Sequence, residues 1–383
     1  MTILFTAANS VFSTTDKGYS VTASDYVIIN SDAHVGSSAS YGLDLRVFNV
    51  PHYVLNYGQI LSTVSTALFM TFNQSADILY NYGSISGKNA GVALYGFTDY
   101  FYNAGQIYGG GIGYLLYGNG NSEVSNDGSI QGGNFGVYFS GIGVHLVNNY
   151  GQITGTTAIA GINSAGAERV NNYGAIKGNV TLGDGADIVR MFDAGYITGT
   201  TNLGTGIDQY FGGTRNDTVY GGSEADTLYG YGGGDSLYGE SGADGIKGGT
   251  GTDIIRGGLD RDFLWGGDTT GANDGARDTF VFASLETGRT IGTADVIYDF
   301  VNGTAATADR IDLSLMDAKV DTIPNDAFAF IGAGAFTGVA GQLRSVVSGN
   351  WTYISGDTDG NRTADFYIDL SGAKTLAATD FIL

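Results

Sequence analysis

The chain has no cysteine and only 2 prolines among its 383 residues. Without cysteine it can form neither disulfides nor thiolate metal sites, so an extracellular chain would need another source of stability. It contains no run of 18 apolar residues, and we therefore expect no transmembrane segment. Basic residues are also few: 17 stand against 38 acidic ones, for a formal net charge of −21. This balance argues against binding to nucleic acid or to an anionic membrane surface.

Glycine and aromatic residues are abundant instead, with 64 Gly, 25 Tyr and 20 Phe. Disordered chains are poor in aromatics, and no apolar stripe with a period of 3.6 residues persists, so the composition indicates stacked β-strands. The acidic residues are unevenly distributed, because 26 of the 38 lie after residue 200. We expect this half of the chain to repel itself until divalent cations bind.

An aspartate recurs every nine residues between Gly204 and Gly267, and an apolar residue stands two positions after each one. The segment Gly248-Gly249-Thr250-Gly251-Thr252-Asp253-Ile254-Ile255-Arg256 shows the complete frame. Glycine allows a turn with φ > 0, aspartate adds a hard anionic oxygen, and the apolar residue begins a short inward-facing strand. The apolar column is Tyr210, Val219, Leu228, Leu237, Ile246, Ile255 and Leu264. A flexible linker would not keep these positions in phase.

This nonapeptide resembles the G-G-x-G-x-D-x-U-x repeat of the RTX family, the hemolysin-type calcium-binding repeats. The resemblance implies a parallel β-roll in which Ca²⁺ lies between vertically adjacent turns, with about five or more ions. Nine residues make half a coil. We therefore expect alternate aspartates to stack on one side of the roll (Asp208, Asp226, Asp244 and Asp262) and the rest on the other (Asp217, Asp235 and Asp253).

The candidate calcium ligands are the repeat aspartates, three further acidic residues and the turn glycines. Asp187 belongs to Leu182–Asp187, a segment that matches Leu203–Asp208 and places an RTX-like frame before the nonapeptides begin. Some copies lack a turn glycine, because Arg215, Glu224 and Asp260 replace the fourth position and Tyr231 and Glu240 the second. We expect weaker or rearranged coordination near Arg215. Besides the seven repeat aspartates, the candidates are Asp187, Asp260, Asp278, Gly204, Gly206, Gly213, Gly222, Gly230, Gly233, Gly242, Gly249 and Gly251.

A second repeat, Asn-x-Gly-x-Ile, precedes the nonapeptides at steps of 22 to 25 residues. Such a regular step predicts a solenoid, and short strands within each copy favour a parallel β-helix with one coil per copy. The Asn, the apolar residue two positions before it and the Ile four positions after it share one parity and should face inward. An earlier coil is expected around Asp25–Val35, with residues 1–20 as an N-terminal cap. The repeat begins at Asn56, Asn81, Asn103, Asn126, Asn149 and Asn172.

The C-terminal half is similar to the C-terminal region of the serralysin metalloproteases. The similarity rests on phrases such as Asp278–Phe282, Asp295–Phe300 and Asp309–Ser314, and on the last four residues, Asp380–Leu383. It implies export by type I secretion machinery, and therefore a secreted, extracellular or cell-surface protein of a Gram-negative bacterium. The first six residues lack the basic segment of a cleavable signal peptide, which agrees with such export. No H-E-x-x-H motif is present, so no serralysin-like protease is expected.

The sequence thus predicts an all-β chain with a parallel β-helix over residues 1–200. This β-helix continues into an RTX β-roll over residues 201–268 and a C-terminal β cap with the secretion signal over residues 269–383. A smaller calcium candidate, Asp357-x-Asp359-Gly360-Asn361-x-x-x-Asp365, has a misplaced glycine for an EF-hand, and an Asp-rich turn is the favoured interpretation.

The role of the β-helix is less explicit. Four residues before each repeat Asn stand His52, Asp77, Asp99, Ser122, His145 and Glu168, which we interpret as a solvated turn. The alternative is a glycan groove or a weak metal site, beside a column of tyrosines that follow the Asn: Tyr57, Tyr82, Tyr150 and Tyr173.

Two hypotheses follow for the function. The first is a non-enzymatic structural protein of a surface layer, matrix or adhesin that self-associates. The second is a secreted carbohydrate-active protein, such as a polysaccharide epimerase or lyase, or a glycan-binding protein acting on cell-surface polysaccharide. Regular repeats leave little room for the irregular insertion that usually builds a catalytic cleft, so we favour the first.

Overall fold

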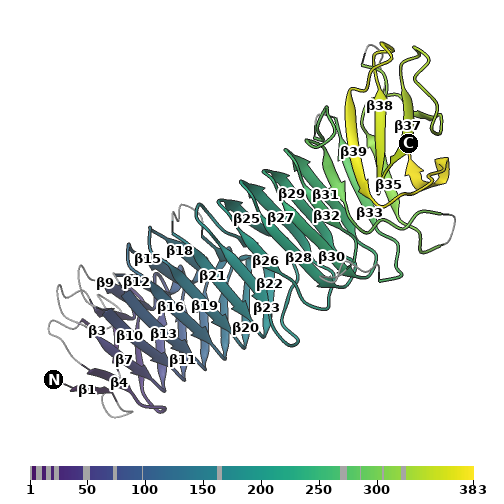
Figure 1. Ribbon diagram of the computed structural model, residues 1–383. Coiled ribbons are helices and arrows are strands. Elements are labelled where there is room, and N and C mark those ends of the chain that lie inside the picture. Colours follow the sequence, from purple (N-terminus) through teal and green to yellow (C-terminus); the bar gives the residue numbers. More distant parts are fainter. Residues whose placement is uncertain are drawn as a thin grey trace. The chain divides into compact units, whose positions relative to one another are not determined.

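The computed structural model describes all residues except 1, 6–10, 14–18, 21–25, 46–51, 72–75, 97, 162–165, 268–273, 285, 304–305 and 321–324. The chain forms two compact units, Met1–Gly204 and Thr205–Leu383, which are considered in turn (Figure 1). In the described part of the chain, no helix is long and apolar enough to span a membrane.

Unit 1 is a parallel β-helix with up to three short strands per coil. The strands that open the coils are β1 (Thr2–Phe5), β4 (Tyr26–Ile29), β7 (Tyr53–Asn56), β10 (Ala76–Asn81), β13 (Thr98–Asn103), β16 (Ser122–Asn126), β19 (His145–Asn149), β21 (Glu168–Asn172) and β23 (Ile188–Met191). They are followed by β2 (Val11–Ser13), β5 (His34–Ser37), β8 (Gln59–Ser62), β11 (Ser84–Gly87), β14 (Gln106–Gly109), β17 (Ser129–Gly132), β20 (Gln152–Ala160), β22 (Ala175–Thr181) and β24 (Tyr196–Ile197). The remaining strands are β3 (Tyr19–Ser20), β6 (Leu43–Leu45), β9 (Leu68–Thr71), β12 (Ala90–Tyr95), β15 (Ile112–Tyr117), β18 (Phe135–Ser140) and β25 (Thr201–Thr205).

The β-helix begins earlier than the Asn repeat indicates. Strand β1 pairs with β4, β2 with β5 and β3 with β6, all in parallel, so two coils precede Asn56. The prediction that residues 1–20 form a separate cap is therefore wrong for the strands described there. These coils lack the Asn-x-Gly signal because strand pairing needs only the alternation of apolar residues. Asp25, where the earlier coil was expected to start, lies outside the described residues.

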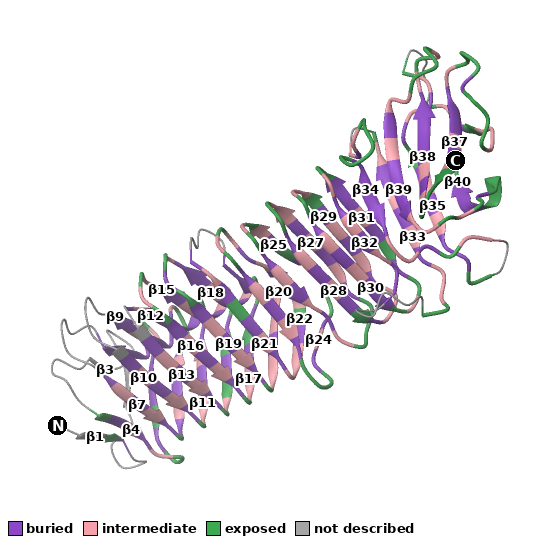
Figure 2. Ribbon diagram, viewed as in Figure 1, coloured by how far each residue is buried: buried purple, intermediate pink, exposed green. Residues whose placement is uncertain are grey.

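The predicted inward-facing columns of the β-helix are confirmed. The apolar residue two positions before each Asn is fully or almost fully buried. It pairs in register with its equivalents in neighbouring coils, as Leu79 does with Phe101 and Val124 with Val147. The six Asn side chains are buried as well, and each Nδ2 from Asn56 to Asn149 donates to Oδ1 of the next at 2.7–2.8 Å. Figure 2 shows the resulting alternation of buried and partly exposed positions along the strands.

Unit 2 begins as a β-roll with one strand per nonapeptide and therefore 18 residues per coil. One row of parallel strands holds β26 (Gln209–Phe211), β28 (Thr227–Gly232), β30 (Gly245–Thr250), β32 (Phe263–Trp265) and β34 (Asp295–Ile297). The other holds β27 (Thr218–Ser223), β29 (Ser236–Ser241), β31 (Ile254–Leu259), β33 (Thr279–Ala283), β35 (Arg310–Leu315) and β40 (Phe381–Ile382). All seven residues of the predicted apolar column, from Tyr210 to Leu264, are 0% exposed.

The C-terminal part of unit 2 is a β cap. Strands β37 (Gln342–Ser348), β38 (Trp351–Asp357) and β39 (Phe366–Ser371) form an antiparallel meander, and β36 (Ala329–Phe330) pairs with β37. Strand β39 also pairs in parallel with β34, which joins the meander to the roll. A 3-10 helix, η2 (Ala378–Asp380), leads into β40.

Candidate calcium site

The repeat aspartates of unit 2 form a continuous hydrogen-bonded ladder. Each one stands at the start of a strand, and from Asp226 onward its Oδ1 accepts the backbone N–H of the aspartate one coil earlier, at 2.7–3.0 Å. Asp208 donates to Asp226, Asp226 to Asp244 and Asp244 to Asp262, while the second row runs from Asp217 through Asp235 and Asp253 to Asp278. The predicted separation of alternate aspartates into two rows is thus confirmed.

The second carboxylate oxygen of these residues has a different environment. Among the residues that the structure describes, none donates a hydrogen bond to the buried Oδ2 of Asp217, Asp226, Asp235, Asp244, Asp253, Asp262 or Asp278. An uncompensated buried carboxylate oxygen is costly, and a hard cation is one group that offsets this cost. The side chains therefore keep one oxygen for the backbone and leave one available for a metal ion.

From Asp217 to Asp262, the glycine five positions before each aspartate is required for space. A Cβ on Gly230 would lie 2.1 Å from Oδ2 of Asp235, and a Cβ on Gly248 would lie 2.2 Å from Oδ2 of Asp253. No side chain can occupy that position while the carboxylate stays in place. The backbone of the turn consequently runs close to the free oxygens and brings carbonyl groups near them.

The other turn glycines supply backbone conformation. Positive φ is found at Gly204, Gly206, Gly222, Gly233, Gly242, Gly249 and Gly251. The replacements Glu224, Tyr231, Glu240 and Asp260 also have a positive φ, between 68° and 78°, which is smaller than the 112° to 133° of these glycines. Gly213 and Arg215 do not have a positive φ, so the turn that carries Arg215 has a different backbone. The weaker or rearranged coordination expected near Arg215 stays a prediction.

Burial raises the pKa of the roll aspartates. The pKa of Asp226 and of Asp235 rises to about 8, and that of Asp262 to about 9, where the charge of Asp295 adds to the effect of burial. For Asp217, Asp244 and Asp253 the rise is smaller, to about 6. Ionised carboxylates are thus disfavoured in the folded roll unless a positive charge accompanies them.

The ladder extends past the last nonapeptide. Asp262 donates its N–H to Oδ1 of Asp295, and Asp278 donates to Oδ1 of Asp309, both at 3.0 Å. The nine-residue period does not predict Asp295 and Asp309 as members of the site, because insertions break the interval of nine. The signal that remains is an aspartate two residues before a fully buried apolar residue, here Ile297 and Ile311. Oδ2 of Asp309 already accepts the N–H of Val301 at 2.7 Å, which leaves that carboxylate less suited to a metal ion.

A carboxylate and carbonyl donor set with buried, unpartnered oxygens suits Ca²⁺, which takes six to eight oxygen ligands. The residues that would hold it are Asp217, Asp226, Asp235, Asp244, Asp253 and Asp262, together with carbonyl groups of the turns. Bound Ca²⁺ would supply positive charge to the buried rows and cross-link successive coils.

The Peptidase M10 serralysin C-terminal family model matches residues 167–383, more than half of the chain. The chain belongs to this serralysin C-terminal family. The match includes the last coils of unit 1. It therefore begins before the nonapeptides, which start at Gly204. The RTX-type repeats of the family typically bind Ca²⁺.

No curated protein matches the chain significantly. Among solved structures, two subunits of the Azotobacter vinelandii mannuronan C5-epimerase are similar to this family member. The AlgE6R2 subunit is 26% identical with a TM-score of 0.29, covering 45% of this chain and 92% of its own. The AlgE6R3 subunit is 27% identical with a TM-score of 0.21, covering 45% and 80%. At these TM-scores the likeness carries no inference about this chain.

Asp187 takes part in the same kind of contact within unit 1 of this serralysin C-terminal protein. Its Oδ1 accepts the N–H of Glu168 at 2.6 Å, and both side chains are fully buried. The RTX-like frame at Leu182–Asp187 therefore reproduces the ladder geometry inside the β-helix. Its assignment as a calcium ligand stays a prediction, as do those of the other candidates.

The polar column of the β-helix is buried, and its interpretation as a solvated turn is wrong. His52, Asp77, Asp99, Ser122, His145 and Glu168 are all at most 6% exposed. Stacking of successive coils covers them, an effect that the polarity of the single residues does not reveal. Burial lowers the pKa of His145 to about 4, so this imidazole is neutral at pH 7 and stacks on Phe139.

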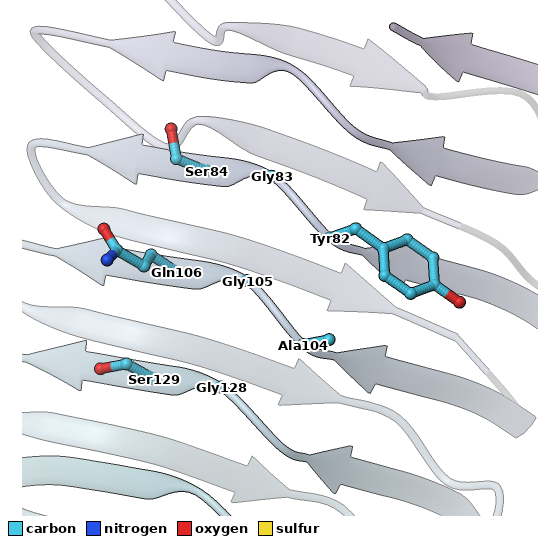
Figure 3. Close-up of a pocket in the computed structure, with 8 residues that line it drawn as sticks. All are labelled: Tyr82, Gly83, Ser84, Ala104, Gly105, Gln106, Gly128 and Ser129. Atoms are coloured by element: carbon cyan, nitrogen blue, oxygen red, sulfur yellow. The ribbon is translucent and has the colours of Figure 1, made fainter. Parts of the chain in front are cut away.

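The tyrosines that follow the repeat Asn are stacked, and Tyr57, Tyr82 and Tyr150 are about half exposed, whereas Tyr173 is less exposed. Tyr57 and Tyr82 stack at 5.1 Å between ring centroids, and Tyr150 and Tyr173 at 4.6 Å. Ala104 interrupts the column, and a groove of about 500 Å³ lies there between Tyr82 and Ser129 (Figure 3). The described residues that line this groove are neutral: Gly, Ala and Ser make up most of the lining, together with Tyr82 and Gln106.

The Asp357 segment brings three carboxylates together. Asp357, Asp359 and Asp365 each place an oxygen within 4.8 Å of the others. These groups accept hydrogen bonds from their own loop: Asp357 from the N–H groups of Gly360 and Arg362, and Asp365 from Thr358. This pattern favours the Asp-rich turn over a calcium site.

Proposed function

We propose that this chain is a secreted calcium-binding protein whose roll folds when it meets Ca²⁺ outside the cell. The observation that carries the proposal is the pair of rows of buried Oδ2 oxygens without hydrogen-bond partners in unit 2. In the absence of Ca²⁺, repulsion and desolvation of these carboxylates oppose folding. Because the ion binds the folded roll, it stabilises that state by mass action. Circular dichroism in EGTA and then in millimolar Ca²⁺ tests this: the β-signal should rise, and an unchanged spectrum would contradict it.

Export is proposed to use a type I secretion system of a Gram-negative bacterium. Membership of the serralysin C-terminal family supports this, as does the acidic-apolar ending Asp380–Leu383. The same ending is part of the folded cap, since Oδ1 of Asp380 accepts the N–H of Gly303 at 2.7 Å and Phe381 pairs with Ile311. A chain that stays unfolded at low cytosolic Ca²⁺ could pass the transporter and then dock this segment.

The export proposal is tested in a Gram-negative host that carries a type I transporter. Deletion of residues 380–383 should leave the protein in the cells, whereas deletion of residues 1–20 should leave export intact. Equal amounts of the 380–383 deletion and the intact chain in the medium would contradict the proposal.

Beyond calcium binding, we propose that the protein is structural and self-associates at a cell surface or in a matrix. Stacked tyrosines such as Tyr57, Tyr82 and Tyr150 are about half exposed, and such side chains provide contact area at low entropic cost. The net charge of −21 opposes association until divalent ions screen or bridge the surfaces. Light scattering across a Ca²⁺ titration should show growing particles. A protein that stays monomeric at high protein concentration and millimolar Ca²⁺ would contradict the proposal. The control is a titration with Mg²⁺ at equal ionic strength.

A carbohydrate-active role has weaker support. Its candidate groups were the polar column, which is buried and does not form an open row for a polysaccharide chain. A cell-surface polysaccharide would instead meet the exposed tyrosines, as a bound ligand. Turnover of an acidic or neutral polysaccharide by the intact protein, lost in Asp77→Ala/Asp99→Ala, would favour the enzyme over the structural role.

A further inference from the structure

Two carboxylates of the β-helix repeat the geometry of the roll aspartates. Asp77 in β10 and Asp99 in β13 are paired in register, and each stands two residues before a fully buried core residue. Oδ1 of Asp77 accepts the N–H of His52 at 2.9 Å, and Oδ1 of Asp99 accepts the N–H of Asp77 at 3.3 Å. Neither residue belongs to a nonapeptide.

Their second oxygens are also without hydrogen-bond partners. Oδ2 of Asp77 and Oδ2 of Asp99 are buried and accept no hydrogen bond from any described residue, and the two side chains are 1% and 2% exposed. The His52 ring lies beside Asp77, with Nδ1 3.6 Å from Oδ1, on the oxygen that already accepts a hydrogen bond. These two Oδ2 atoms therefore resemble those of the roll, because they are buried carboxylate oxygens to which no described residue donates a hydrogen bond.

A third oxygen joins them from another strand of the coil. The hydroxyl of Tyr114, in β15, is completely buried and has no hydrogen-bond partner. Its ring stacks on Phe101, with centroids 4.6 Å apart and an interplanar angle of 5°, which fixes its direction. Phe101 follows Asp99 by two residues in β13, so the Tyr114 ring lies against the strand that carries this carboxylate. Burial, followed by the charges of Asp99 and then Asp77, raises the pKa of this hydroxyl well above its usual value.

The site is accessible to small ions. A groove of about 380 Å³ reaches Asp77, Asp99 and Ser122 and has Glu123 on its lining. No Lys or Arg lines it, so no basic side chain neutralises the carboxylates from that direction. A small cation fits such a position, whereas a substrate the size of a sugar could not reach side chains that are at most 2% exposed.

We propose that Asp77, Asp99 and Tyr114 form a divalent-cation site inside the β-helix, separate from the RTX turns. The ion would lie among two carboxylate oxygens and a phenolic oxygen, a hard donor set that suits Ca²⁺. It would join the coils of β10 and β13 in unit 1, as calcium is proposed to join coils of the roll.

The test is the number of Ca²⁺ ions bound per full-length chain, measured by equilibrium dialysis. Asp77→Asn/Asp99→Asn keeps the Oδ1 acceptors and should bind one ion fewer than the unmodified protein. Asp127→Asn changes an exposed carboxylate of the same unit and should bind the full number. Equal ion numbers for the unmodified protein and the folded double variant would overturn the proposal.

If the double variant fails to fold, Tyr114→Phe provides a second test of the same site. It removes one oxygen and should weaken the binding of a single ion about tenfold, the scale seen when one supporting group of a metal site is lost. Unchanged affinity for every ion would count against the site. Asp235→Asn, in the roll, should change a different binding step, so loss of the roll sites and loss of this site are distinguishable.

Discussion

The backbone N–H of Asp235 donates a 2.7 Å hydrogen bond to Oδ1 of Asp253, which lies one coil further along the roll. This contact fixes the carboxylate of Asp253 and leaves its Oδ2 buried and without a hydrogen bond. Repetition of the contact turns a sequence period into two rows of aligned oxygens. Each repeat therefore supplies both a carboxylate and a backbone N–H to the ladder.

Replacing one roll aspartate by its neutral isostere should weaken calcium binding without removing the ladder. Asp235→Asn keeps an oxygen for the N–H of Asp217 but removes a negative charge from the row. We expect the Ca²⁺ concentration at the folding midpoint to rise about tenfold, equivalent to about 1.4 kcal/mol. Asp32→Asn, at an exposed position of unit 1, is the control. An unchanged midpoint for Asp235→Asn would speak against Asp235 as a ligand.

A methyl group at the first turn glycine should displace the neighbouring carboxylate. The Cβ of Gly230→Ala would lie 2.1 Å from Oδ2 of Asp235 and 2.4 Å from the carbonyl oxygen of Gly248. We expect a loss of about 1–3 kcal/mol in the unfolding free energy at saturating Ca²⁺, measured by denaturant titration. Gly245→Ala is matched to it, because its nearest neighbour would be 3.9 Å away. Equal stability of the two variants would refute the packing argument.

The Ca²⁺-free roll should become more stable on acidification. In the fold, burial raises the pKa of Asp226 and Asp235 to about 8 and, with the charge of Asp295, that of Asp262 to about 9. The unfolded chain titrates near the ordinary value of about 4, so between these values the folded state binds more protons. The stability that these protons contribute is complete below about pH 4 and is lost as the pH rises from there through about 8 to 9. In chelator-treated protein, circular dichroism should show more β-structure at about pH 5.5 than at about pH 8. A signal that falls on acidification would contradict the assignment of these pKa shifts.

The sequence predicted the parts of the fold that repeat locally and missed those that depend on stacking. Asp217 to Asp262 and Asn56 to Asn172 were found because each side chain recurs at a fixed interval. The polar column at Asp77 and Asp99 was misjudged as solvated, since burial there comes from coils that lie 22 or 25 residues away in the chain. Asp295 was not predicted, because insertions between the strands place it outside the nine-residue period.

The Asn ladder should carry much of the local stability of unit 1. Asn126 donates to Oδ1 of Asn149 at 2.8 Å and accepts from Nδ2 of Asn103 at 2.7 Å. Asn126→Ala leaves both neighbours with an unmet buried group, which costs about 1–3 kcal/mol. Hydrogen exchange of peptides covering β16 and β19 should accelerate accordingly. Asn134→Ala, at an exposed position in the same coil, should leave exchange unchanged, and a similar response to both would contradict the role of the ladder.

We propose that Ca²⁺ orders the roll of unit 2 through its buried aspartate rows. This ordering can be measured by peptide-resolved hydrogen exchange of the full chain in EGTA and in millimolar Ca²⁺. We predict that peptides covering β27 to β31 exchange rapidly in EGTA and become strongly protected in Ca²⁺. Peptides covering β16 to β19 in the β-helix should be protected in both conditions. Protection of β27 to β31 that is the same with and without Ca²⁺ would contradict the claim.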